Sequence, residues 1–186
     1  RSSDLGFGAK LCIHPKQVAI VKAAFMPTEE EIQAELAERN KTRLSDEEIQ
    51  SAIEQGNRAK GYGFAGQVGG GFFGSGGGSV ALGLAGLTRP FSGLIGEDAY
   101  IYLSKVGQWN SQVGETSKGD DWTGTIANLI GRTPVDLARL GLLSRLPGGP
   151  VVMFSADSLL QSAGSGKSRE EISKETLKGA GLGAVF

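Results

Sequence analysis

The chain has 186 residues and a mass of 19.3 kDa, which is enough for one ordinary domain with an appendage. Its 19 basic and 20 acidic residues give a net charge of -1. No basic excess is therefore present to neutralise phosphates, and nucleic acid is not an expected partner. One cysteine, Cys12, and one histidine, His14, exclude an intrachain disulfide, a cysteine-built zinc site and a two-histidine metal site within the chain.

The first predicted unit is a short strand followed by a helix. Residues 9–13 are apolar and follow a glycine-containing turn, which is typical of a strand. Pro15 suits the first position of a helix, because its φ is fixed and its missing N–H has no partner there. Apolar residues then recur at helical spacing until Pro27, so we expect a helix over 15–25.

Two charged helices are predicted next. The capping-box pattern of Ser or Thr followed three residues later by Glu occurs at 28–31 and at 45–48. It predicts helices over about 28–40 and 45–57. Each has only a thin apolar stripe, which indicates helices that lie on a surface or pair with each other.

A glycine-rich segment over 61–96 follows, with Arg89 as its one charge. Glycine recurs there at every fourth position, at Gly66, Gly70, Gly74 and Gly78. Residues four apart share one face of a helix, so these glycines would form a smooth groove that another helix could approach closely. The uncharged run is also longer than the roughly 20 residues that cross a bilayer.

The same segment contains two glycine triplets, and each glycine costs a helix in water about 1 kcal/mol. Three interpretations of residues 61–96 therefore stay open. The segment is an irregular loop or linker, a helix packed against another helix or in contact with a membrane, or a loop that cradles a ligand.

The C-terminal region, residues 97–186, is predicted to be mainly helical and of unknown type. Its elements in chain order are a strand or helix at 99–106, a polar loop at 114–125, an amphipathic helix at about 134–146, a strand at 151–154 and a capped helix from 168 to about 178. The steps in composition divide the chain into domains 1–60, 61–96 and 97–186. The predicted fold class is mixed α/β and rich in helix.

Residues 5–31 resemble the last strand and last helix of the citrate lyase β-subunit-like lyases, within the HpcH/HpaI aldolase group. The matching elements are Gly6-Phe7-x-x-Lys10, Ile13-His14-Pro15-x-Gln17-Val18 and Phe25-x-Pro27-Thr28. The resemblance implies that the chain begins with the end of a (β/α)₈ barrel. The rest of the chain resembles no family in this way.

This resemblance implies a lyase that makes or breaks a carbon–carbon bond in a CoA thioester with a divalent metal, Mg²⁺, in the cytoplasm or mitochondrial matrix. His14 would be a catalytic residue at the carboxyl end of a barrel strand, although it could also simply cap the following helix. The carboxylates and the arginine of the family lie on earlier strands. We therefore expect a C-terminal piece of a lyase that is not active alone.

The alternative is a non-enzymatic protein that works by membrane contact or in an oligomer or larger complex, using the glycine groove as its helix-packing site. Two weaker motifs do not change this choice. Gly164–Ser168 resembles the end of a phosphate-binding loop, but Gln161 stands where such a loop needs glycine, so a polar loop is favoured. Asp120 and Asp121 are expected in a solvated turn rather than a cation site.

Overall fold

The computed structural model describes residues 28–185, and their contacts divide the chain into two units, residues 1–37 and 38–186. The first unit contributes only the exposed beginning of helix α2 (Glu29–Thr42) to the described residues. The second unit holds the end of α2 and every later element. The strand expected at 9–13, the helix expected at 15–25 and His14 all lie outside the described residues.

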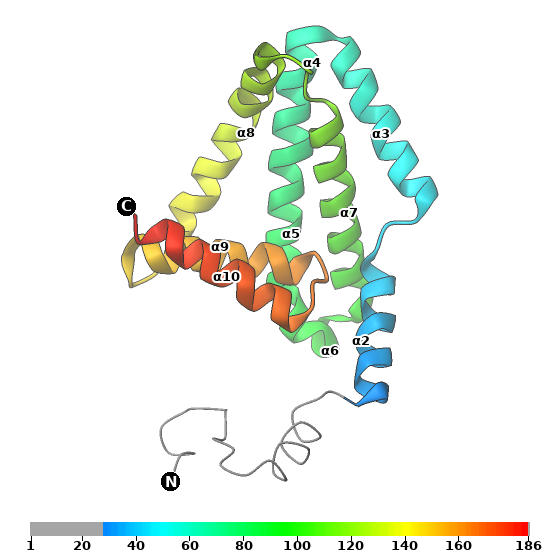
Figure 1. The fold of residues 1–186 in the computed structure, drawn as a ribbon, viewed down its shortest axis with the longest axis vertical. Coiled ribbons are helices and arrows are strands. Elements are labelled where there is room, and N and C mark those ends of the chain that lie inside the picture. The colour runs from blue at the N-terminus through cyan, green and yellow to red at the C-terminus, as the bar shows by residue number, and fades with distance from the viewer. Residues whose placement is uncertain (1–27, 186) are drawn as a thin grey trace, which may run out of the picture. The chain divides into compact units, whose positions relative to one another are not determined.

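The described part of the second unit is built from helices joined by short turns and contains no strand (Figure 1). After α2 the elements are α3 (Asp46–Gly61), α4 (Gly63–Gly69), the π-helical η2 (Gly70–Gly76), α5 (Gly77–Thr88), the 3₁₀ turn η3 (Arg89–Phe91), α6 (Ser92–Ile95), α7 (Glu97–Thr116), α8 (Trp122–Leu143), α9 (Gly149–Gly164) and α10 (Arg169–Gly183).

The prediction of a mixed α/β fold is wrong, because residues 28–185 form an all-α structure. The strand expected at 151–154 lies inside α9, where Pro150 in the first turn favours a helix start. Residues 99–106, left open between strand and helix, belong to α7. Short apolar runs fit either element by periodicity, and here their packing against other helices decides.

Of the predicted helix starts, the one marked by a capping box agrees with the structure and the one marked by a proline does not. The capping box at 45–48 is confirmed, and Glu48 also lies 3.2 Å from Lys105 of α7. The bond from the backbone of Ser45, together with Lys105, lowers the pKa of Glu48. The helix expected to begin near Pro134 instead begins twelve residues earlier, at Trp122, with Pro134 in its interior.

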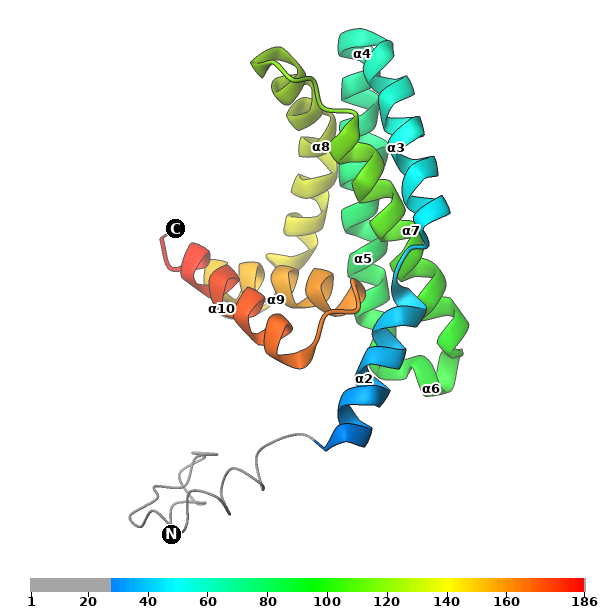
Figure 2. The same cartoon turned by 45° about the vertical axis from the view of Figure 1, so that its right-hand side comes forward.

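Residues 63–88 form one central helix, made of α4, η2 and α5. The backbone stays right-handed across both joins, with φ near -60° at Gly70 and Gly77, so the glycine triplets do not interrupt the helix. The central helix packs against α3, α7, α8 and α9, and Figures 1 and 2 show α5 between α7 and α8. These contacts offset the cost of glycine in a helix.

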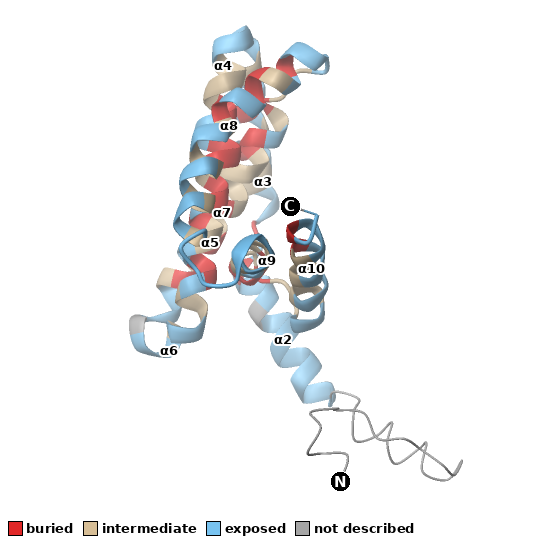
Figure 3. Ribbon diagram, turned by 90° about the vertical axis from the view of Figure 1, so that its left-hand side faces the viewer, coloured by how far each residue is buried: buried red, intermediate tan, exposed pale blue. Residues whose placement is uncertain are grey.

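The core of the second unit is built from small side chains. The buried apolar residues are mostly alanine, and the buried polar residues are mostly serine; they are Leu44, Ala52, Ala81, Ala85, Tyr100, Val113, Ala127 and Ala163, with Thr42, Ser75, Ser79, Ser104, Ser117, Asn128 and Ser162. Many large apolar side chains are exposed instead, and Figure 3 shows exposed positions along the outer sides of the helices. Small residues inside let the helix backbones come close together.

Helices α9 and α10 form a hairpin that crosses the lower part of α5 (Figures 1 and 2). Both α5 and α9 carry a glycine at this crossing. A Cβ on Gly86 would strike the carbonyl of Leu160 in α9, and a Cβ on Gly164 would strike the carbonyl of Leu82 in α5. The crossing therefore depends on backbone-to-backbone contact.

We predict that Gly74→Ala lowers the free energy of unfolding by about 1–3 kcal/mol, because the added Cβ would lie 2.5 Å from the backbone nitrogen of Gly114, which cannot yield as a flexible side chain can. Gly83→Ala is the matched control. It adds a Cβ in the same helix with nothing within 4 Å, so it should raise stability by about 0.5–1 kcal/mol. Urea unfolding of both variants tests this, and shifts of the same sign would contradict the packing.

Candidate functional site

The predicted groove glycines do not share one neighbour. Gly70, Gly74 and Gly78 face α7, where an added Cβ would strike Ser117, Gly114 and Ser111 respectively. Gly66 lies apart from them, and its Cβ would strike the carbonyl of Ala59 in α3. The structure therefore fills this side of the central helix with helices of the same chain.

Helix α7 supplies glycines of its own to this contact. A Cβ on Gly107 would strike Leu82, and one on Gly114 would strike the backbone of Ser75. Glycine on both sides lets the two backbones approach closely and gain dispersion contacts along their length. We call this contact the glycine seam, made by Gly70, Gly74 and Gly78 with Gly107 and Gly114.

The π-helical turn η2 keeps the seam in register. The N–H of Gly77 bonds to the carbonyl of Phe72, five residues earlier, which makes a wider turn than that of an α-helix. An α-helix turns once in 3.6 residues, so a repeat of four drifts steadily around its axis. The wide turn offsets that drift, and Gly70, Gly74 and Gly78 all stay on the side of α7.

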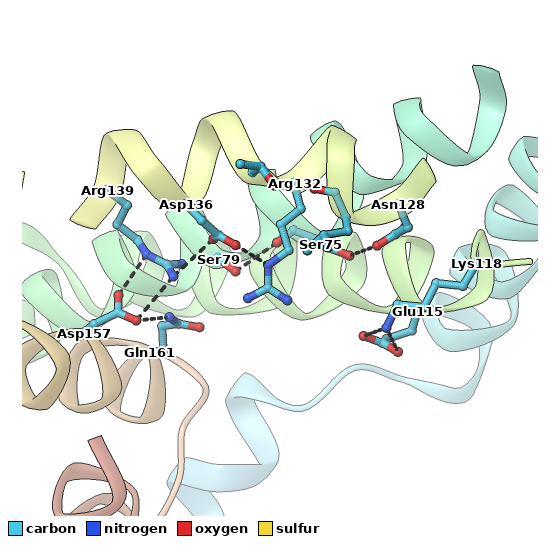
Figure 4. A network of polar contacts seen from close by, with 12 residues as sticks. Ser75, Ser79, Glu115, Lys118, Asn128, Arg132, Asp136, Arg139, Asp157 and Gln161 are labelled. Carbon is cyan, nitrogen blue, oxygen red and sulfur yellow. Dashed lines mark hydrogen bonds and ion pairs between the residues drawn. The ribbon is translucent and has the colours of Figure 1, made fainter. Parts of the chain in front are cut away.

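A small buried polar centre joins η2, α7 and α8 (Figure 4). Asn128 of α8, which is 3% exposed, donates through Nδ2 to the carbonyl of Gly114 at 3.1 Å and to Oγ of Ser117 at 3.3 Å. Its Oδ1 accepts from Oγ of Ser75 at 3.4 Å. These bonds satisfy the buried amide and join the three elements.

A second polar cluster links α8 to α9 (Figure 4). Nε of Arg139 lies 2.8 Å from Oδ1 of Asp157, and Nη2 of Arg139 lies 3.2 Å from Oδ1 of Asp136. Asp136 also pairs with Nε of Arg132 at 2.5 Å, and Gln161 donates to Asp157 at 2.9 Å. Two arginines balance two aspartates, so this half-buried cluster has no net charge. Each carboxylate is paired with an arginine.

Arg89, the one charge within residues 61–96, holds the end of α9. Its Nη1 donates to the carbonyls of Ala163 at 3.3 Å and Lys167 at 3.2 Å. Its guanidinium also lies 5.8 Å from the ring centre of Tyr100, within the range of a cation–π contact. A cation at the carboxyl end of a helix also opposes the negative end of the helix dipole.

The loop that resembles part of a phosphate-binding loop is a helix start. Oγ of Ser168 accepts from the N–H of Glu171 at 3.3 Å, and the carboxylate of Glu171 accepts from the N–H of Ser168 at 3.0 Å. The capping box predicted here is confirmed, and its backbone bond lowers the pKa of Glu171. That carboxylate occupies the place where an anion would meet the start of α10.

The two adjacent aspartates also have structural partners. Asp121 caps α8 by accepting from the N–H of Gly124 at 3.0 Å. The bonds from the hydroxyl of Thr123 and from Gly124 lower the pKa of Asp121. Asp120 pairs with Lys60 at 2.6 Å. Within residues 28–185, no three His, Cys, Asp or Glu side chains gather where they could hold a metal ion.

One exposed feature of the central helix was missed from the sequence. Phe73, Val80, Leu84 and Leu87 are 73%, 40%, 47% and 53% exposed and follow one another at helical spacing. We call these four residues the outer stripe. At roughly 100 Å² for each partly exposed side chain it presents about 400 Å² of apolar surface, as much as the largest patch of many monomers. The sequence signal for these four residues was their helical spacing within a run that carries no charge.

Two glycines lie among these residues. An added Cβ would meet nothing within 4 Å at Gly83 and only a carbonyl at 3.9 Å at Gly77. The stripe therefore alternates large side chains with open positions. Such a surface can receive the side chains of another helix.

Comparison of the chain with models of known families, with curated proteins and with solved structures found no match. The resemblance of residues 5–31 to the lyase family stays a prediction, as do the CoA thioester and Mg²⁺ that it implies. Across residues 28–185, no helix combines the length and the apolar character needed to cross a bilayer. The class that residues 28–185 define is an all-α fold with a glycine-packed centre.

We expect Arg89→Met to lower the free energy of unfolding by about 1.5–3 kcal/mol, because the end of α9 loses two charge-assisted bonds. The control is Arg58→Met. Its side chain is 73% exposed, so the change should stay within about 0.5 kcal/mol. Thermal and urea unfolding measure both, and equal effects would show that Arg89 does not secure α9.

Proposed function

We propose that residues 28–185 act as a non-enzymatic binding module, in which the glycine-packed helices present the outer stripe to an apolar partner. The observation that carries this proposal is the distribution of side chains. Alanine, serine and glycine fill the interior, while Phe73, Val80, Leu84 and Leu87 stand outside.

Single exposed apolar side chains are normal on protein surfaces, but a continuous patch on an uncharged helix marks an interaction site. Burying about 400 Å² would contribute about 10 kcal/mol before costs. Association alone costs about 4–15 kcal/mol. The stripe therefore supports reversible binding, strengthened by whatever polar contacts lie around it.

The polar clusters favour a scaffold role. Asn128 and its serines bond to one another and to backbone, and Arg139 pairs with Asp136 and Asp157. Each cluster joins helices that form the support of the outer stripe. A lyase role rests on residues 5–31, most of which lie outside the described range.

We predict that the double variant Leu84→Glu with Leu87→Glu loses association that the parent chain has, measured as sedimentation in solution and co-flotation with uncharged lipid vesicles. Two carboxylates cannot be buried against an apolar surface without a large cost. The matched control is Leu177→Glu with Leu182→Glu on α10, where both leucines are 72% and 58% exposed. If the stripe variant behaves like the parent and the control, the outer stripe has no binding role.

The full chain should also show no turnover of malyl-, citramalyl- or citryl-CoA, with or without Mg²⁺. The described residues bring together no reactive group with an activating partner. A product assay by chromatography checks this. Metal-dependent release of product that His14→Ala abolishes would show an enzyme and overturn the non-enzymatic proposal.

A further inference from the structure

We infer that the hairpin of α9 and α10 is a lid on the lower part of α5. It turns about the loop before α9, and it is held closed at its opposite end, where α9 turns into α10. Closed, it covers the backbone of α5 at Gly86. This conformational device is independent of the outer stripe and goes beyond the proposed function.

The hairpin is docked mainly at one end. The buried residues of α9 are Ser162, Ala163 and Gly164, all in its last turn, and Gly166 in the following turn is buried as well. Residues 132–161, by contrast, contain no buried residue. Helix α10 packs along α9, which lies between α10 and the other helices (Figure 3). A segment with so few buried contacts opens at a lower free energy than the core.

Specific contacts hold that same end closed. Arg89 of η3 donates to the carbonyls of Ala163 and Lys167. Gly166 lies directly against the end of α2, where an added Cβ would strike the hydroxyl of Thr42. We call these contacts of Arg89 and Thr42 with the α9–α10 turn the latch. The latch joins the hairpin to two elements that are far from it in the sequence.

The other end of the hairpin has a loop that can act as a pivot. Residues 144–150 are all exposed. Gly148 and Gly149 have φ values of +119° and +67°, which glycine adopts without steric cost. Hinges are a few loop residues whose φ and ψ angles change while the flanking helices stay intact. A change at these two glycines would swing the hairpin about the loop and part the latch.

Opening would leave the rest of the second unit folded. The movement separates Arg139 of α8 from Asp157 of α9, but Arg139 keeps its pair with Asp136 on its own helix. Asp157 becomes hydrated, so opening leaves no charge buried without a partner. Helix α5 keeps its packing against α7, where Gly78 lies against Ser111.

Native-state hydrogen exchange of the full chain in low urea tests whether the hairpin opens by itself. Helices of this length are marginal alone, so an undocked hairpin exchanges its amides. Amides of α9 and α10 should exchange at least about tenfold faster than those of α7. Their exchange should also depend less on urea, because opening exposes less surface than global unfolding. One common opening for all three helices overturns the inference.

Spin labels then test whether the hairpin moves as a body. The labels are placed on the full chain with Cys12→Ser, at Arg58→Cys in α3 and Leu177→Cys in α10, both exposed positions. Double electron–electron resonance gives the distances between them. Weakening the latch with Gly166→Ala and Arg89→Met together should add a second distance, with the ratio of open to closed chains raised at least about tenfold. The strain of alanine at a φ of +70° alone supplies a factor of this size.

The control is Gly181→Ala, which lies in the same hairpin and adds a Cβ with nothing within 4 Å. It should leave the distance distribution unchanged. Circular dichroism shows whether each variant is folded. A single unchanged distance in the folded latch variant would mean that the hairpin frays in place and would overturn the lid. If the latch variant does not fold, the exchange rates of the parent chain decide.

Discussion

The close approach of the central helix to α7 is the contact on which the rest of the structure depends. It requires glycine at Gly74 and Gly114, because a Cβ on either would meet the backbone of the other helix. Asn128 of α8 joins this contact by donating to the carbonyl of Gly114 and accepting from Ser75. The same closeness leaves no room for large side chains between the helices, so leucine and phenylalanine occupy the outer surface.

The glycines that allow this packing weaken the helix that carries them. Each costs about 1 kcal/mol relative to alanine when the helix stands alone, so residues 63–88 would not hold a helix without α7, α8 and α9. The central helix and its packing against these neighbours therefore form together. Arg89 secures the carboxyl end of α9 and Arg139 pairs with Asp157 in its middle, which keeps the crossing in place.

Features encoded by neighbouring residues could be predicted from the sequence. The capping boxes at 45–48 and 168–171 need only residues three apart, and both occur. The helix at 151–154 could not be distinguished from a strand, because its apolar run is too short to show a period. The repeat from Gly66 to Gly78 predicted a packing face but not its neighbours, since these depend on the path of the chain. The outer stripe could not be predicted, because residues 61–88 carry no charge and so show no polar face against which an apolar face stands out.

The wide turn at η2 makes the length of the central helix as important as its composition. Deleting one residue from that turn would restore ordinary α-helical winding, yet every residue after it would keep its present face, because a π-helical turn is an α-helical turn with one residue more. The same deletion made early in α5 would instead rotate everything after it by about 100°, and Leu87 would replace Gly86 against the carbonyl of Leu160. A single-codon deletion would thus be accommodated at η2 and would disrupt the crossing with α9 a few residues later, although the composition of the helix would barely change in either case.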